Sequence, residues 1–272
     1  MKKKIIVATD LTEAGSKAIL QAMYIAHRIS AELTLLHVND DNLIPEAVIK
    51  NSLKQEAEKV HLISGIKCGI LILHGNMFEE IALTTAEGEY CLMVIATHAI
   101  HGVRQMLLGS DILRLVMKVH IPVLVVQKKS PLINEFKQII LPVASHVSFY
   151  AVIDAVMFLA LAFNAVVILY YIHKPGCDLP GQLLQNIEEA SRIFMENGVQ
   201  MMCIKEDQNV YSPFYAEQTL AYALQSGADC ICVMSIPSKE YNYFAQSDKE
   251  TLLLNENHIP ILCAGGGKTE GF

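Results

Sequence analysis

The chain of 272 residues has few charged side chains and no cluster of basic ones. Charged residues make up 18% of the sequence, and the formal net charge is −7. Nucleic-acid binding draws much of its free energy from counterions that clustered lysines and arginines release, so scattered basic charge argues against DNA or RNA as a partner. Hydrophobic residues reach 52%, which excludes intrinsic disorder. The length allows one large domain or two domains of ~100 to 200 residues.

The seven cysteines are an odd number and show no repeated spacing. We interpret them as buried thiols of a reducing compartment, which predicts a cytoplasmic protein. Cys230 and Cys232 are the only close pair; we expect their side chains on opposite faces of a strand, and no metal site is predicted. The start, MKKKIIVATD, reaches Asp10 after too few apolar residues for a secretory signal peptide, so none is expected.

Strand-like runs alternate with helical patterns in the first half of the chain. The strand-like runs lie at 4–10, 31–38, 66–73, 91–96 and 122–127. Apolar residues at helical spacing occupy 13–29, 43–63, 77–88 and 109–119. Strands separated by helices predict right-handed βαβ units, with a parallel sheet that helices cover on both faces. The predicted fold class is therefore α/β.

The second half of the chain repeats this pattern. KQIILPVA at 137–144 matches KKIIVATD at 3–10, an offset of 134 residues, and HIPILCA at 258–264 matches HIPVLVV at 120–126, an offset of 138. A period held over several elements indicates an internal duplication. The charged, proline-containing stretch 128–135 separates the copies, so we predict domains over 1–130 and 136–268.

The longest hydrophobic run, 155–172, is broken only by Asn164 and is by itself a candidate membrane span. The offset of 134 residues places Asn164 opposite Ser30, where a helix of the first copy ends and a strand begins. We therefore expect a helix near 148–163 rather than a membrane span. Its surface is apolar all round, so we expect it to pack against the other copy.

An open parallel sheet binds ligands outside the carboxyl ends of its strands, where the strand order reverses. With the order 3-2-1-4-5, that crevice lies between Thr9 and Asp10, after the first strand, and the segment 96–99, after the fourth. Gly109 and Ser110 open the next helix, whose free N–H groups favour a phosphate. Ser110 is equally expected as an ordinary helix cap.

These segments resemble the universal stress protein family. The matching residues are the first strand into Asp10, LLHVND at 35–40, HGNMFEEIALTTAE at 74–87, VIATH at 94–98 and LLGSDILRLVMKVHIPVLVV at 107–126. The resemblance implies two tandem Rossmann-like domains of the adenine nucleotide alpha hydrolase-like type. Each is then an open five-stranded parallel sheet of order 3-2-1-4-5 with helices on both faces.

Nucleotide-binding members of that family carry a Gly-x2-Gly-x9-Gly-Ser/Thr motif over the phosphates, an Asp after the first strand and a Val beside the adenine. The resemblance implies ATP or AMP as a ligand of the first copy, with Mg²⁺ only if ATP binds. The binding residues that it implies are Ala8, Thr9, Asp10, Val38, Ala96, Thr97, His98, Ala99, Gly109 and Ser110. Alanine replaces both leading glycines, and its methyl group keeps phosphate oxygens farther from the backbone.

The second copy has lost the residues of this motif. Ala144 stands in the place of Asp10, and Ser247 and Asp248 stand in the places of Gly109 and Ser110. An Asp at a phosphate-facing helix start repels the ligand. We predict that the second copy binds no nucleotide and has a structural role.

The sequence features and the resemblance together predict a cytoplasmic stress-response protein with a binding or regulatory role. No Ser-His-Asp or paired-carboxylate arrangement can be assembled, so no catalytic residue is predicted. The alternatives are a ligand-free protein–protein interaction module and a weak ATPase switch. The copies are expected to form an intramolecular pseudo-dimer through their last strands, Val123–Val126 with Ile261–Ala264. A homodimer of whole chains stays open, and a membrane partner is not expected.

Overall fold

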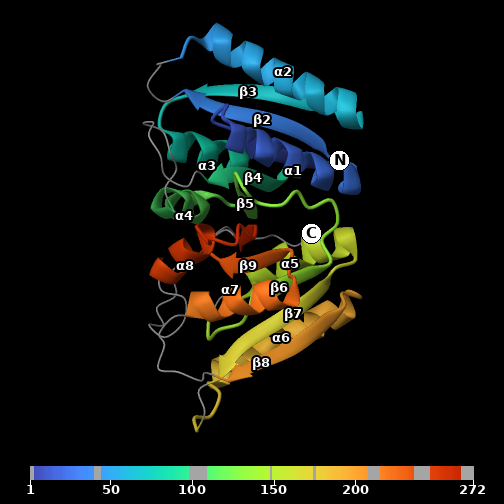
Figure 1. Ribbon diagram of the computed structural model, residues 1–272, viewed down its shortest axis with the longest axis vertical. Helices are drawn as coiled ribbons and strands as arrows, with labels where there is room; N and C mark the ends of the chain where they lie inside the picture. Colours follow the sequence, from blue (N-terminus) through green and yellow to red (C-terminus); the bar gives the residue numbers. More distant parts are fainter. Residues whose placement is uncertain are drawn as a thin grey trace.

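The structure is a computed structural model that describes residues 3–39, 44–97, 109–147, 149–173, 176–207, 215–235 and 246–264. Strands and helices alternate along the chain (Figure 1). The first half contains β1 (Lys4–Ala8), α1 (Glu13–Ile29), β2 (Glu32–Asn39), α2 (Glu46–Ser64), β3 (Cys68–His74), α3 (Met77–Glu87), β4 (Tyr90–Thr97), α4 (Gly109–Lys118) and β5 (Val123–Gln127). The second half contains β6 (Gln138–Pro142), α5 (Tyr150–Phe163), β7 (Val166–His173), α6 (Gly181–Glu196), β8 (Met201–Asp207), α7 (Tyr215–Ser226), β9 (Cys230–Met234), α8 (Gln246–Leu253) and β10 (Ile261–Ala264).

The strands form one 10-stranded sheet of order β3-β2-β1-β4-β5-β10-β9-β6-β7-β8. Each half has the predicted order 3-2-1-4-5, and neighbouring strands within a half are parallel. The halves meet where β5 pairs with β10 in antiparallel fashion, with Leu124 opposite Leu262. This pairing confirms the α/β fold and the predicted contact through the last strands, and it joins the two sheets into one (Figure 1).

Helices cover both faces of the sheet. One core contains α1, α2, α5 and α6 and includes Ala22 and Val156; the other contains α3, α4, α7 and α8 and includes Val116 and Leu252. Each core runs through both halves, because alternate residues of every strand face opposite sides of the sheet. Strands buried on both faces are apolar throughout, which explains the high share of hydrophobic residues.

The long apolar run divides at Asn164, as the repeat predicts. α5 ends at Phe163, Asn164 adopts a left-handed conformation with φ 56°, and β7 begins two residues later. Ser30 has the same conformation in the first half, with φ 54°. Among the residues that the structure describes, no helix combines the length and apolar character needed to cross a bilayer.

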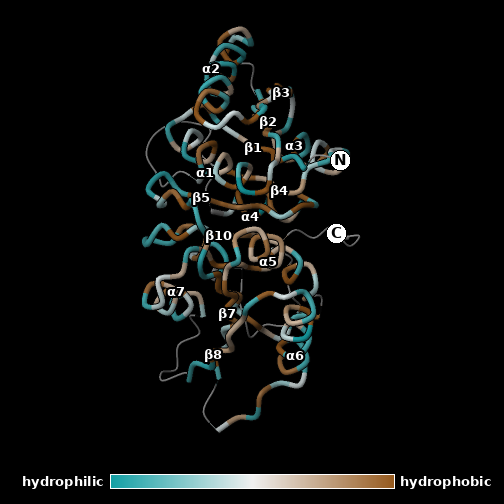
Figure 2. The backbone as a smooth tube through the Cα atoms, turned by 90° about the vertical axis from the view of Figure 1, so that its right-hand side faces the viewer, coloured by the Kyte–Doolittle hydropathy of each residue, from teal (hydrophilic) through white to brown (hydrophobic). Residues whose placement is uncertain are grey.

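Helix α5 packs against the first half as well as against its own sheet. It lies over β9 and β10 and contacts α1, and Figure 2 shows it as a hydrophobic helix close to β10. Across this contact, Arg28 Nε donates to the carbonyl oxygen of Ala162 at 2.6 Å, and its guanidinium lies 5.8 Å from the ring centroid of Phe163. The expected packing of α5 on the other copy is confirmed.

The segment between the halves is packed, although its sequence is charged. Gln21 of α1 donates to the Ile133 carbonyl at 2.8 Å and accepts from the Ile133 amide at 2.9 Å. Phe136 is buried and meets Phe163 edge to face, with centroids 5.0 Å apart. The connection therefore belongs to the core that both halves share.

A buried amide network holds the end of β5 to the second half. Gln127 is 5% exposed, and its Nε2 donates to the carbonyl oxygens of Asn255 at 2.9 Å and of Leu253 at 3.3 Å. Its Oε1 lies 2.8 Å from His258 Nδ1. Buried polar groups need such partners, so the network fixes how β5 and the residues after α8 meet.

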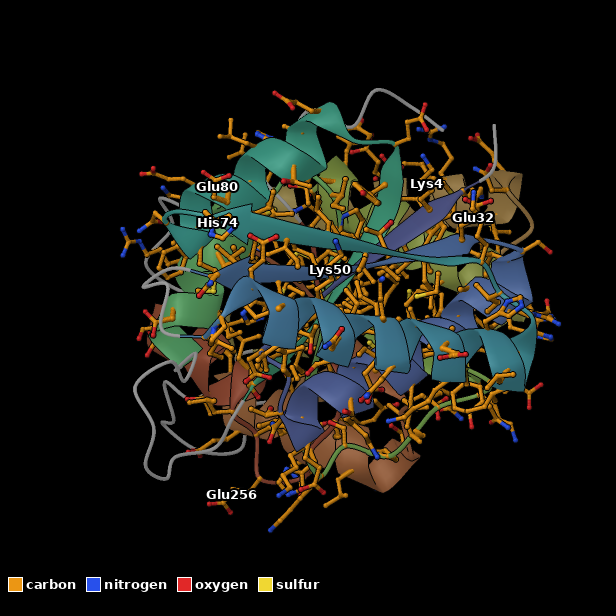
Figure 3. All side chains as sticks on the ribbon, turned by 90° about the horizontal axis from the view of Figure 1, so that it is seen from above. Lys4, Glu32, Lys50, His74, Glu80 and Glu256 are labelled. Atoms are coloured by element: carbon orange, nitrogen blue, oxygen red, sulfur yellow. The ribbon has the colours of Figure 1, made fainter. Side chains whose placement is uncertain are left out.

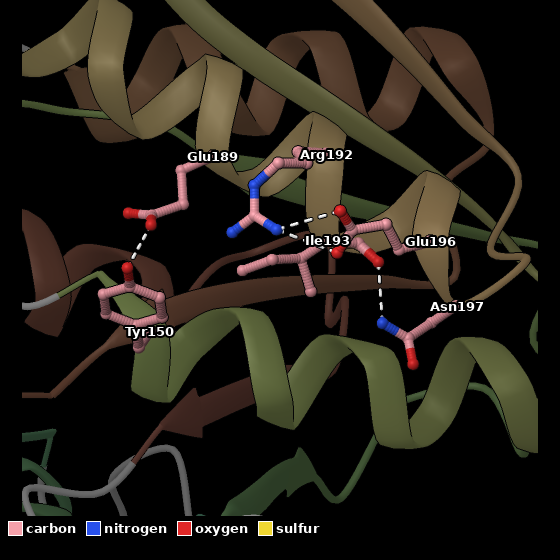
Figure 4. Close-up of polar contacts among 6 residues, drawn as sticks. All are labelled: Tyr150, Glu189, Arg192, Ile193, Glu196 and Asn197. Atoms are coloured by element: carbon pink, nitrogen blue, oxygen red, sulfur yellow. Dashed lines mark hydrogen bonds and ion pairs between the residues drawn. The ribbon is translucent and has the colours of Figure 1, made fainter.

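Polar contacts also link α5 and α6 on the outside of the second half (Figure 4). The Tyr150 hydroxyl of α5 donates to the Glu189 carboxylate of α6, and within α6 Arg192 pairs with Glu196 at 2.8 Å. Exposed pairs of this kind contribute little to stability because water screens them. The apolar core beneath them holds α6 on the sheet.

We expect Gln127→Ala to lower the free energy of unfolding by about 2 kcal/mol, because two carbonyl oxygens and a histidine nitrogen lose a partner away from water. Urea denaturation followed by circular dichroism measures this loss. Lys129→Ala, at an exposed position two residues on, is the control and should stay within about 0.5 kcal/mol of the parent. An unchanged midpoint for Gln127→Ala would contradict the role of the network.

Candidate functional site

Three neighbouring strands of the first half end at one edge of the sheet. β1 lies between β2 and β4, where Ala8 pairs with Leu36 and with Ile95. The residues that follow these pairs reach the same edge; they are Thr9, Asp10, Val38, Ala96 and Thr97. Figure 3 shows the two ends of this half: His74, at the carboxyl end of β3, lies opposite Lys4, at the start of β1.

Thr9 is fixed by its neighbours in β2. Its amide donates to the Leu36 carbonyl oxygen at 2.9 Å, and its own carbonyl oxygen lies 2.9 Å from Nδ1 of His37. His37 is only 4% exposed. Its imidazole holds the turn after β1 in place rather than reaching toward a ligand.

Asp10 builds the turn that leads into α1. Its Oδ1 accepts from the Thr12 amide at 3.0 Å and from the Thr12 hydroxyl at 2.7 Å. Leu11, between them, has a positive φ of 63°. Thr12 in turn caps α1 by accepting from the Gly15 amide at 3.4 Å. The half-buried carboxylate therefore already has a structural task at the edge where a ligand would bind.

Gly15 lets the first turn of α1 approach Thr9 closely. A Cβ atom at this position would lie 2.3 Å from Thr9 Oγ1 and 2.9 Å from Asp10 Oδ1. A Cβ atom does not approach another atom this closely, so any larger residue would displace the side chains of Thr9 and Asp10.

The end of β4 supplies the opposite wall of the crevice. Ala96 is half-buried, and Thr97 is 1% exposed with no hydrogen-bond partner for its Oγ1. α4 begins at Gly109, and Ser110 in its first turn is exposed. His98 and Ala99 lie outside the described residues. A buried hydroxyl without a partner is costly, so Thr97 marks a place where a ligand or water can bond.

The corresponding edge of the second half has a different chemistry. Ala144 follows β6, and its carbonyl oxygen accepts from the Asn186 amide at 2.6 Å. His146 stands where the first half has Thr12, and Lys249 where it has Asp111. Both are buried, at 5% and 4% exposed, and both line one small cavity.

Sequence reasoning overlooked His146 and Lys249. One feature of the sequence could have revealed this site. Lys249 occupies the position in the second half that Asp111 occupies in the first, so the charge in the first turn of the helix is reversed. Burial, and then the Lys249 ammonium, lowers the pKa of His146 to about 4. Burial lowers the pKa of Lys249 to about 8.

The cysteines differ in part from the prediction. All seven are free; Cys230, Cys232 and Cys263 are buried, but Cys177 and Cys203 are exposed, so the expectation of buried thiols is wrong for these two. The prediction of opposite faces for Cys230 and Cys232 is also wrong, because residues two apart in a strand share a face, and both lie in the core with α5. Among the described residues, no three His, Cys, Asp or Glu side chains are placed to hold a metal ion.

A model of the Universal stress protein family matches residues 1–127. Universal stress protein YxiE of Bacillus subtilis is 27% identical over 131 residues, covering 40% of this chain and 88% of that protein. Universal stress protein MJ0531 of Methanocaldococcus jannaschii is 29% identical over 141 residues, covering 46% of this chain and 82% of that protein.

Solved structures match both halves of the fold together. A universal stress protein from Archaeoglobus fulgidus superposes with a TM-score of 0.71 at 13% identity, over 98% of this chain and 97% of its own. PA1789 of Pseudomonas aeruginosa, a protein of unknown function, has a TM-score of 0.60 at 18% identity, over 97% and 92%. At these identities the likeness shows the fold alone, and it extends over the whole chain.

We expect Gly15→Ala to lower the free energy of unfolding by about 1 to 3 kcal/mol, because the new methyl group overlaps the Thr9 side chain. Thermal and urea unfolding measure the change. Gly181→Ala is the matched control: no atom lies within 4 Å of its added Cβ, and an Ala in a helix is neutral or slightly stabilising. Equal stability of the two variants would contradict the close approach at Gly15.

His146 makes the stability of the second half depend on pH. Its pKa is lowered from 6.5 to about 4 in the folded chain, so between these values only the unfolded chain takes up the proton. The contribution of His146 to the free energy of unfolding is therefore complete above pH 6.5. As the pH falls from 6.5 toward 4, this contribution is lost by at most about 1.4 kcal/mol per pH unit.

His146→Gln removes this titration, so the variant should lose less stability than the parent between pH 7 and pH 5. Urea midpoints at both pH values measure the difference. His120→Gln, at an exposed position, is the control and should keep the pH dependence of the parent. If His146→Gln keeps it too, His146 is not the group responsible.

Proposed function

Because the chain belongs to the universal stress protein family, as a two-domain member, we propose that it is a regulatory binding protein whose first half holds an adenine nucleotide. The ligand is ATP or AMP, with Mg²⁺ bound only together with ATP. The site lies at the carboxyl edge of β1, β2 and β4, between the turn at Asp10 and the first turn of α4.

The observation that carries this proposal is the meeting of three strand ends at one edge, where the buried hydroxyl of Thr97 has no hydrogen-bond partner. Asp10 follows β1, Val38 is the second-last residue of β2, and Thr97 is the last residue of β4. This is the edge where open parallel sheets bind ligands. Ser110, exposed in the first turn of α4, adds a hydroxyl near the helix N–H groups that attract phosphate.

The alanines of the motif set the affinity. Ala96 and Ala99 stand where the family motif has glycine, and each methyl group increases the distance between phosphate and backbone N–H groups. We expect weaker binding than a site with both glycines would give, and stronger dependence on the adenine side of the crevice at Val38.

The remaining parts of the proposal concern the whole chain. The domains are 1–130, which binds nucleotide, and 136–268, which binds none and supports the first. The protein acts by binding rather than by catalysis, in a stress response. A cytoplasmic location is supported by the seven free thiols, which are typical of a reducing compartment.

A ligand-free interaction module is the second candidate function. It is favoured by the double hydrogen bond from Thr12 to Asp10, which occupies one oxygen of the carboxylate that a ligand would need. In that case the turn at Asp10 is purely structural.

An ATPase switch is the third candidate function. Phosphate release from ATP that depends on Asp10 and Ser110 would favour it.

We expect ATP or AMP to bind at millimolar concentration or below, and Asp10→Asn to weaken binding at least about tenfold, equivalent to ~1.4 kcal/mol. Isothermal titration calorimetry with ATP, ADP and AMP, with and without Mg²⁺, measures this. Asp178→Asn, an exposed carboxylate in the second half, is the control and should leave binding unchanged.

The double variant Ala96→Gly, Ala99→Gly restores the glycine pattern and should tighten binding by about tenfold. The absence of binding at millimolar nucleotide, both in the parent and in the double variant, would rule out the nucleotide site. Unchanged binding in Asp10→Asn would remove Asp10 from it.

A further inference from the structure

The two outermost strands of the sheet differ in their protection against further strands. β8, at the end formed by the second half, carries Lys205, Glu206 and Asp207. Charged side chains on an outer strand discourage other strands from adding to it. β3, at the opposite end (Figure 1), has the sequence CGILILH and contains no Lys, Arg, Asp, Glu or Pro. The edge of β3 therefore lacks the protection that β8 has.

β3 is apolar but only partly covered. α2 and α3 contact it on its two faces, and among the described residues no strand except β2 pairs with it. Residues 70–73 are half-buried, whereas every residue of β5 and of β10, which have a strand on either side, is buried. An apolar strand with one open side readily accepts another strand.

The backbone of β3 directs hydrogen-bonding groups to this open side. The Leu33 amide of β2 donates to the Lys67 carbonyl oxygen at 3.0 Å, so the backbone groups of Lys67 and of every second residue after it point toward β2. Those of Ile70 and Ile72 point the other way. If the added strand is another β3, antiparallel pairing of Ile70 with Ile72 of the second copy bonds these groups in both directions. Leu71 then lies on a two-fold axis, opposite its own counterpart.

In this register the side chains of two β3 strands fit together on both faces of the sheet. Ile70 and Ile72 face the core with α2, and each meets an isoleucine of the second copy. Leu71 and Leu73 face the core with α3. Leu73 of the second copy lies opposite Gly69, which is exposed and leaves room for it, because a Cβ atom on Gly69 would lie 3.8 Å from a backbone oxygen, an ordinary contact. Apolar cross-strand pairs of this kind stabilise a sheet.

The charges beside β3 favour the antiparallel direction. Lys67, just before the strand, has a side chain that is 80% exposed and lies 3.6 Å from Glu32. In the same register Lys67 lies opposite Gly75 of the second copy, just after that strand. The Glu80 carboxylate lies beside Gly75, with its Oε1 3.1 Å from the position of a Cβ atom on that residue. Figure 3 looks onto this edge and shows Glu80 and His74 together at one end of β3. Antiparallel pairing therefore brings a lysine of one copy to a glutamate of the other at both ends, whereas parallel pairing would bring like charges together.

We infer that the chain forms a homodimer in which β3 pairs antiparallel with β3 of a second copy, about a two-fold axis at Leu71. Two ten-stranded sheets then join edge to edge, as β5 and β10 join the two halves within one chain. The partner is a second copy because one register suits the backbone, the apolar side chains and the charges of both strands at once. The inference does not depend on nucleotide binding in the first half.

Analytical ultracentrifugation of the full chain, at about 1 to 100 μM, measures the dimer. We expect the parent to form a dimer as its concentration rises. Gly69→Lys should raise the dissociation constant at least about tenfold, because a lysine then faces Leu73 of the second copy. Gly69 is exposed, so circular dichroism should show an intact fold. Met202→Lys, at an exposed position on the other outer strand, is the matched control and should leave the dimer unchanged.

An exchange of charges tests the register. Lys67→Glu and Glu80→Lys should each raise the dissociation constant by about threefold or more, because each variant brings like charges together twice in the dimer. The double variant Lys67→Glu, Glu80→Lys should restore the affinity of the parent. A double variant that dimerises no better than the single variants would contradict the register.

Leu71→Cys supplies a covalent readout at the two-fold axis. Opposite residues that share no hydrogen bonds have Cα atoms ~4.5 Å apart, within the range for a disulfide, so a mild oxidant should link two copies through this residue. The parent and Leu224→Cys, exposed in α7, are the controls for linkage through other thiols. The inference is overturned by a parent that stays monomeric up to about 100 μM or by a dimer that persists in Gly69→Lys. Linkage of Leu71→Cys no greater than that of the controls overturns it as well.

Discussion

The antiparallel pairing of β5 with β10 is the contact on which the arrangement of the whole chain depends. Both strands are buried along their full length, so either half alone would leave an apolar strand at an open edge, where further strands add readily. The pairing covers both edges at once. It also brings α1 against α5 and α4 against α8, which makes the two cores continuous across the halves.

The direction of this pairing separates the crevice of the first half from the cavity of the second half. Thr97, at the end of β4, pairs with Gln127 at the carboxyl end of β5. Met234, at the end of β9, pairs with Ala264 of β10. The preceding residue, Cys263, pairs with Val123 at the amino end of β5. The crevice at the ends of β1 and β4 and the cavity at His146 and Lys249 therefore lie at opposite ends of the central strands. Each can change its chemistry without disturbing the other, because the apolar core between them carries the fold.

The repeat made most of the fold predictable from the sequence, because one offset carries Ser30 onto Asn164 and both residues end a helix with positive φ. The packed connection was not predictable, since Gln21 bonds Ile133 across 112 positions only once the halves have joined. The cavity at Lys249 was missed for a similar reason. A lysine after an Asp at a helix start is typical of an exposed residue, and its burial depends on where α8 settles.

The second half also shows what the turn at Asp10 contributes. Ala144 replaces the carboxylate there, and α5 begins at Tyr150 without a side-chain cap, three residues later than the offset of 134 from Glu13 would place it. The Asn186 amide instead holds the Ala144 carbonyl. A strand can thus lead into a helix in this fold without an Asp. The turn alone does not require Asp10 in the first half, and this is the physical reason to look for a ligand beside it.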